Sequence, residues 1–97
     1  MVSGQVEHEQ SQSRFVYKAS ESQEAAFLKY EKQEDGTLDL RHTYTPPSLR
    51  GQGIAERLTK AAFDYAEQQG VKVIPTCPYI SDKYLVKHPD KRQFSKM

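Results

Sequence analysis

The chain has 97 residues, of which 14 are lysine or arginine, 13 are aspartate or glutamate and one is cysteine. Its length suits one domain with a single modest core. The formal net charge of +1 provides no overall positive field of the kind that drives nucleic-acid binding, which favours a small ligand or a protein partner. One cysteine excludes an intrachain disulfide, and the chain shows no signal-like segment or membrane-length apolar run, so we expect a cytoplasmic protein without a membrane partner.

The N-terminal residues 1–13 are rich in glutamine, serine and glutamate and show no apolar periodicity. Such a segment buries too little apolar surface to hold itself in place. The sequence therefore predicts a flexible N-terminal arm over residues 1–13 and a single domain over residues 14–97.

Two strand-like segments come next, residues 14–18 and residues 25–33. The polar residues 20–23 between them are typical of a turn, so the two strands are expected to pair as a hairpin. An Asp-Gly turn signal at residues 35–36 leads into a third strand over residues 37–45. Alternation in that strand predicts that four side chains share one face: Leu38, Leu40, His42 and Tyr44. The three strands would form an antiparallel meander.

A helix and a further strand follow the two prolines at residues 46–47, which end the third strand. Apolar residues recur at helical spacing over residues 53–69, and Gly70 is a natural C-terminal stop. Residues 71–76 are typical of a short strand, and the strand, helix, strand order favours parallel pairing through a right-handed crossover. Residues 81–82 can cap a last helix. The expected fold is α/β (α+β): three antiparallel strands, a helix, a parallel-paired strand and a short C-terminal helix.

The start of the long helix predicts an anion-binding loop. Six residues form it: Arg50, Gly51, Gln52, Gly53, Ile54 and Ala55. Glycines let the backbone turn tightly, and the first amide groups of a helix have no intrahelical partner, so a phosphate suits this positive end of the helix dipole. The pattern lacks the Gly-Lys-Ser/Thr of a Walker A loop and the third glycine of a Rossmann fingerprint. Taken alone, it also fits an ordinary helix start with two turn glycines.

Arg50, Gly53 and Ala55 match the R-x-x-G-x-A form of the acyl-CoA pyrophosphate loop of the GNAT N-acetyltransferase superfamily. Three flanking segments match as well: residues 42–47, 73–79 and 88–90. From about residue 15 to residue 92, the chain thus resembles small single-domain GNAT proteins of the YjdJ-type or NATD-type subfamily.

The resemblance implies a minimal GNAT-like fold that binds acetyl-CoA. The diphosphate would lie on the six-residue loop, and the pantetheine arm would lie in a notch where the third and fourth strands separate. One wall of the notch would come from the third strand: His42, Thr43, Tyr44 and Thr45. The other wall would be Thr76 and Cys77, which places His42 and Cys77 near the thioester.

Four residues are candidates for catalysis. His42 suits a general base that takes a proton from an incoming amine, although a histidine on a strand face is as often a core residue. Cys77 would lie near the thioester and accept the acetyl group as a thiolate, or act as a small buried hydrophobe. Tyr79 or Tyr84 would give a proton to the departing CoA thiolate, as the resemblance implies, or would simply pack. No metal site is expected, because the histidines and Cys77 lack ligand spacing.

The sequence therefore predicts an acetyl-CoA (or CoA) binding protein that acts as an N-acetyltransferase on an unidentified amine or thiol acceptor, either a small molecule or a protein. GNAT enzymes usually carry one or two helices between their first two strands, and these helices wall the acceptor site. Only about six to eight residues are available here, which is a hairpin length. The rival prediction is a non-enzymatic acetyl-CoA-binding sensor or subunit whose partner completes the acceptor site. A nucleic-acid-binding domain is disfavoured, because basic and acidic residues are interleaved.

Overall fold

The computed structural model describes residues 4–19 and 25–95, and its strands form one sheet in the order β1-β2-β3-β4-β5. The strands are β1 (Gly4–Glu9), β2 (Arg14–Ala19), β3 (Ala26–Lys32), β4 (Leu38–Tyr44) and β5 (Val73–Ile74). The helices are α1 (Ile54–Gln69) and the short α2 (Leu85–Lys87). Short helical turns are η1 (Gln10–Gln12), η2 (Pro47–Leu49), the π-helical η3 (Ile80–Tyr84) and η4 (Pro89–Phe94).

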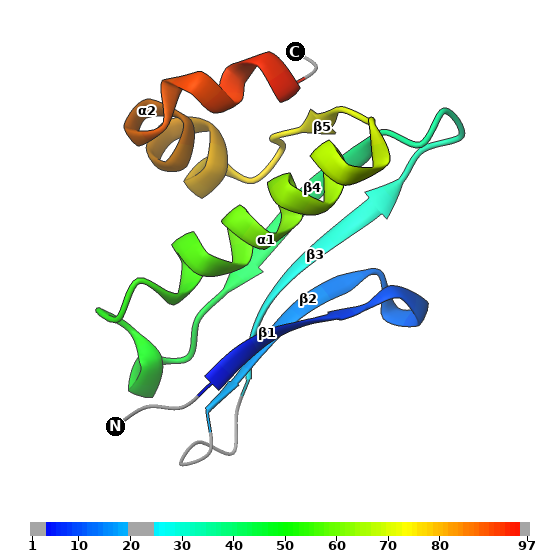
Figure 1. Cartoon of the computed structure of the whole chain (residues 1–97). Helices are drawn as coiled ribbons and strands as arrows, with labels where there is room; N and C mark the ends of the chain where they lie inside the picture. The colour runs from blue at the N-terminus through cyan, green and yellow to red at the C-terminus, as the bar shows by residue number, and fades with distance from the viewer. Residues whose placement is uncertain (1–3, 20–24, 96–97) are drawn as a thin grey trace.

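The amphipathic helix α1 lies across one face of the sheet, and the C-terminal turns pack beside it (Figure 1). Its inward side chains fall at helical spacing: Ile54, Leu58, Ala62, Phe63 and Ala66. They meet the buried side chains of β2, β3 and β4 in one core. On the opposite face of β3 and β4 the side chains of Lys29, Glu31, Arg41 and His42 are exposed. The sheet is therefore covered on one side only over these strands.

The α+β architecture agrees with the sequence-based prediction in its order of elements. Neighbouring strands from β1 to β4 pair antiparallel, and β5 pairs parallel with β4. The meander thus has four strands where three were expected. Strand β5 is shorter than the predicted residues 71–76, because Pro75 follows Ile74 and cannot donate a ladder hydrogen bond. The predicted turn over residues 20–23 lies outside the described residues.

The prediction of a flexible arm is wrong for residues 4–13, since residues 4–9 form the edge strand β1. In its register with β2, Val6 pairs with Tyr17 and His8 pairs with Phe15, so both inward side chains of β1 meet buried aromatic rings. Because one of the two inward residues is a histidine, β1 does not show the alternation of apolar and polar residues by which a strand is predicted from sequence. Pairing with β2 satisfies the backbone hydrogen bonds of β1, a polar segment with too few apolar side chains to form a core by itself.

The last helical segment begins earlier than predicted. Ile80 and Ser81 both donate their backbone N–H to the carbonyl of Cys77, at 2.9 and 3.2 Å. Ser81 therefore lies inside the first turn and does not cap it. Pro78 is not a typical capping residue, so the sequence did not show that a helical turn begins here. The turn begins with the two hydrogen bonds that the carbonyl of Cys77 accepts.

His8 occupies a partly buried position between β1 and α1. Its ring stacks nearly parallel on Phe15 with centroids 4.1 Å apart, and Tyr65 of α1 meets it edge-on at 4.5 Å. Its Nε2 lies 2.5 Å from the hydroxyl of Tyr30. Burial lowers the pKa of His8 below its ordinary value of 6.5.

We expect protonation of His8 to destabilise the fold at acidic pH. Because its pKa is lowered in the folded chain, its contribution to stability is complete above pH 6.5 and is lost as the pH falls through the folded pKa. His8→Phe keeps a ring against Phe15 but does not titrate. Between about pH 7.5 and about pH 5 the native chain should lose more thermal stability than His8→Phe. Circular dichroism melts measure this, and parallel pH profiles would contradict it.

Candidate functional site

A β-bulge in β4 decides which way the predicted site residues point. The pairing of β3 with β4 shifts between Lys29 and Tyr30, which face His42 and Leu40 respectively. Arg41 is therefore an extra residue without a partner on β3. One extra residue reverses the in-and-out alternation of the strand beyond it.

The prediction that His42 and Tyr44 share the face of Leu40 is wrong because of this bulge. Thr43 pairs with the fully buried Leu28, so Thr43 lies on the α1 face together with Leu40. His42 and Tyr44 lie on the opposite face. A sequence pattern contains no mark of a bulge, since Arg41 looks like any outward residue of an alternating strand.

On the opposite face, His42 and Tyr44 flank the ring of Phe27 on β3. The ring centroids lie 5.9 Å apart for His42 and 5.5 Å apart for Tyr44. His42 is exposed and Tyr44 is half-buried. These two predicted wall residues therefore form an aromatic group with Phe27 and do not face Cys77.

Strands β4 and β5 run side by side only briefly before they separate. They pair in parallel over two residues each, and the N–H of Cys77 then donates to the carbonyl of Leu40 at 2.9 Å. Beyond that bond the chain turns into η3. The remainder of β4 has no strand partner on this side within the described residues. The predicted notch between these strands corresponds to this separation.

Thr43 and Cys77 meet where the two strands separate. Their side-chain oxygen and sulfur lie 3.3 Å apart. Cys77 is only 5% exposed and Thr43 is half-buried. Thr76, predicted beside Cys77, is exposed and donates its hydroxyl to the Asp39 carboxylate. Thr43 and Cys77 are thus the predicted wall residues that contact each other.

The loop before α1 has the backbone shape expected for an anion site. Gly51 and Gly53 have positive φ angles of 82° and 71°, which only glycine adopts readily. Gly53 is the N-cap of α1 and no side chain caps the helix. The N–H groups of the first helical turn therefore keep their hydrogen-bonding capacity for another partner. Arg50 donates its Nε to the carbonyl of Thr45 at 3.0 Å, which ties the end of β4 to the loop.

A cavity of about 260 Å³ opens at this loop. It is lined by predicted site residues that follow β4, form the loop or precede η3, together with Leu49 and Glu56. The full set is Thr45, Leu49, Arg50, Gly51, Gly53, Ile54, Ala55, Glu56 and Tyr79. Gln52 is exposed and does not line it. A Cβ added at Gly51 or at Gly53 would meet nothing within 4 Å, so both glycines face open space.

The structure separates the two candidate tyrosines. Tyr79 is half-buried and lines the cavity. Burial raises its pKa, and the charges of Glu56 and Cys77 add to the shift. Tyr84 is 3% exposed, stacks on Phe63 with centroids 5.4 Å apart, and has its pKa raised by burial to about 12. Tyr84 is a core residue in this arrangement, whereas Tyr79 is open to the loop.

Glu56 is a site residue that sequence reasoning missed. It lies in the first turn of α1 and lines the cavity. Lys87 donates its Nζ to one carboxylate oxygen at 3.2 Å, and Nε2 of His88 lies 3.2 Å from the other. Hydrogen bonds from Lys87 and His88 lower the pKa of Glu56. The two partners are more than thirty residues away in the chain, so no local pattern indicates the pairing.

Within residues 4–19 and 25–95, no three or more His, Cys, Asp or Glu side chains are grouped so that they could hold a metal ion. No helix among these residues is both long enough and apolar enough to cross a bilayer.

Comparison with known proteins places most of the chain in one family. A family model described as GCN5-related N-acetyl-transferase matches residues 14–94. Protein NATD1 of Xenopus tropicalis is 38% identical over 84 residues, which cover 87% of this chain and 76% of that protein. Protein NATD1 of Homo sapiens is 37% identical over 84 residues, covering 87% and 74%. The matched region runs from β2 to η4 and so includes the loop, the bulge and the separated strands.

We expect the thiol of Cys77 to react slowly in the folded chain. Its burial at 5% exposure leaves little access for a reagent, and reaction requires a local opening. Alkylation by iodoacetamide should be slower in buffer than in urea by about a hundredfold. Mass spectrometry measures the rate without ambiguity, because the chain has one cysteine. Equal rates in the two conditions would show that Cys77 is accessible.

Proposed function

Because the chain belongs to the GCN5-related N-acetyltransferase family, we propose that it binds acetyl-CoA and transfers the acetyl group to an amine or thiol acceptor. The observation that carries the proposal is the continuity of two features. The separation of β4 from β5 leads directly to the uncapped, glycine-flanked start of α1. An extended pantetheine arm and a diphosphate need these two features side by side.

Binding would use backbone groups more than side chains. The diphosphate would accept hydrogen bonds from the first-turn N–H groups of α1, with the helix dipole adding to the attraction. The pantetheine arm would lie along β4 beyond Leu40, on the edge that faces β5, where no strand pairs with β4 in the described chain. The thioester would then come near Thr43 and Cys77, which lie 3.3 Å apart at the start of the separation.

The transfer step follows from this placement. A strand-edge N–H of β4 would polarise the thioester carbonyl. The nucleophile attacks the carbonyl carbon and gives up its proton to His42 or to a water. The C–S bond breaks, and Tyr79 donates its hydroxyl proton to the CoA thiolate. Tyr79 is protonated near neutral pH, because the ordinary pKa of a tyrosine is about 10 and burial raises that of Tyr79 further. Burial of Cys77 favours direct transfer over an acetyl-cysteine intermediate.

One observation favours a non-enzymatic binder as the second candidate. The connection between β1 and β2 is the three-residue turn η1, so no helix from it walls an acceptor site. A sensor or subunit would keep the loop and the separated strands and would release no CoA with any amine. Measuring CoA release from acetyl-CoA over a panel of small amines separates the two functions.

The proposal predicts that Gly53→Ala weakens acetyl-CoA binding. Its φ of 71° disfavours alanine, and the added methyl group would project into the open space at the cavity. The matched control is Gly70→Ala, at the other end of α1, with φ of 68° and equally open surroundings. Each variant should lose about 1 kcal/mol of stability from the strained backbone.

Calorimetric titration with acetyl-CoA then distinguishes the two glycines. We expect Gly70→Ala to bind like the native chain and Gly53→Ala to bind at least about tenfold more weakly, a loss of about 1.4 kcal/mol. Mass spectrometry of the titrated protein should find no acetyl group on Cys77. Equal affinities of the two glycine variants, or no binding by the native chain at millimolar ligand, would contradict the proposed site.

A further prediction concerns the charge of Glu56. Its carboxylate lies in the helix turn that would hold the diphosphate, and Lys87 and His88 compensate that charge. Glu56→Gln should therefore tighten acetyl-CoA binding by roughly fivefold at low salt, and Lys87→Gln should weaken it by a similar factor. In the double variant the effect of Lys87→Gln should shrink, because its partner charge is gone. Additive effects in this cycle would show that the ion pair does not influence the loop.

A further inference from the structure

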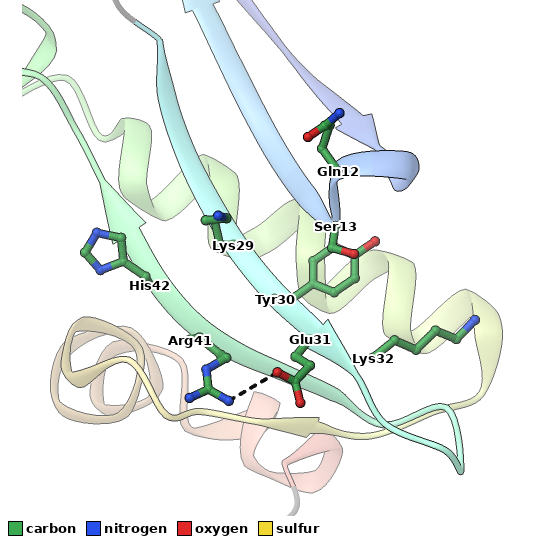
Figure 2. Close-up of a pocket in the computed structure, with 8 residues that line it drawn as sticks. All are labelled: Gln12, Ser13, Lys29, Tyr30, Glu31, Lys32, Arg41 and His42. Atoms are coloured by element: carbon green, nitrogen blue, oxygen red, sulfur yellow. Dashed lines mark hydrogen bonds and ion pairs between the residues drawn. The ribbon is translucent and has the colours of Figure 1, made fainter.

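A second cavity, of about 580 Å³, lies on the sheet face opposite α1 (Figure 2). Its walls come from the end of η1, from β3 between Lys29 and Lys32, and from the bulge residues Arg41 and His42. Cavities of this size are typical of sites for small molecules. Of its lining residues, only His42 was predicted from the sequence to be a site residue, and the cavity at the start of α1 shares none of them.

The bulge of β4 places this cavity next to the separated strands. Thr43 reaches Cys77 on the α1 face, while the neighbouring His42 lines the cavity on the other face. Consecutive Cα atoms are about 3.8 Å apart, so the two sites share the same short piece of backbone. A molecule in the cavity would thus approach β4 from the face opposite Cys77, one residue from Thr43, beside which the thioester would lie.

The uncompensated charge of the cavity is positive. Glu31 is paired with Arg41 at 3.5 Å, and Arg41 also lies 3.4 Å from Asp39. Lys29 and Lys32 have no ion-pair partner in the part of the chain that the structure describes. Figure 2 shows Lys29 between His42 and the η1 turn, on the open side of the sheet. The cavity therefore favours a ligand that carries an anionic group.

Lys29 and His42 are directly opposite each other in the pairing of β3 with β4. Side chains in such a pair are about 5 Å apart at their Cβ atoms. One small ligand can therefore contact the ammonium group with a carboxylate and the imidazole with an amine only a few bonds away. A ligand with only one of these groups would contact only one of the two side chains.

We propose that this cavity binds the acetyl acceptor and that the acceptor is a small amine bearing at least one carboxylate, such as an amino acid. The inference rests on the proposed acetyl transfer. The carboxylate lies at Lys29, and the amine lies at His42, next to the thioester. The amine nitrogen forms a bond to the carbonyl carbon as the C–S bond breaks. His42 takes the proton that the nitrogen loses, and Tyr79 supplies the proton that the CoA thiolate gains.

The binding half of this proposal is tested without acetyl-CoA. Glutamate and its diamide, which keeps the amine but has neutral amides in place of both carboxylates, are titrated separately into the isotope-labelled chain and followed by NMR. Glutamate should shift the backbone amides of residues 29–32 and 41–42, and the diamide should not. Equal shifts from both amines, or shifts confined to other strands, would overturn the anionic class.

The acceptor half is tested by CoA release from acetyl-CoA with the same two amines. In Lys29→Glu, the KM for glutamate should rise by about tenfold while the KM for acetyl-CoA stays unchanged. The matched control is Lys18→Glu, which changes an exposed lysine on β2 that does not line the cavity. Equal effects of the two variants would show that only overall charge matters and would overturn the proposal.

Failure of this inference differs from failure of the proposed function. A chain that binds acetyl-CoA by calorimetry but uses glutamate no better than its diamide lacks this acceptor site and keeps its acetyl-CoA site. A chain that does not bind acetyl-CoA lacks the proposed function, and the acceptor assignment falls with it even if glutamate shifts the cavity amides.

Discussion

The single extra residue in β4 is the constraint on which the functional surface of this protein depends. Arg41 is skipped in the backbone pairing of β4 with β3, and the in-and-out alternation of β4 is reversed beyond it. The side chain of Thr43 consequently lies on the α1 face beside Cys77, while the side chain of His42 lies on the opposite, uncovered face of the sheet. Without the bulge, an alternating strand would bury His42 against the helix and point Thr43 away from Cys77.

The two faces of the sheet therefore present different functional groups. The α1 face holds the loop, the Cys77 thiol and Tyr79, which suits an acyl donor with a diphosphate. On the opposite face, Lys29 has no ion-pair partner among the described residues and lies directly across from His42, a pair that suits an acceptor with a carboxylate and an amine. The short turn η1 leaves that second face open where a helical wall would otherwise stand. An open face would let the proposed acceptor enter, although it would bind that acceptor through few contacts.

Electrostatic compensation at the start of α1 explains how a carboxylate would be tolerated beside the proposed anion site. Glu56 would repel a diphosphate if its charge were free. Lys87 and His88 from the C-terminal turns pair with it and also connect those turns to the helix start. His88 in turn packs on Tyr84, whose ring stacks on Phe63 in the core. The C-terminal turns thus contribute both to the fold and to the charge balance of the loop.

The sequence by itself determined the order of the strands and helices from β2 onward, the uncapped helix start and the family, because each depends on residues close together in the chain. Helical spacing, turn glycines and strand-breaking prolines act locally, and the structure has them where they were expected. Only the tertiary structure decided which side chains lie on the same face and which distant residues contact each other. Strand β1 is held by its pairing with β2, the facing of His42 follows from a register shift, and the partners of Glu56 come from the other end of the chain. Such choices depend on packing between distant segments, which a pattern in consecutive residues does not contain.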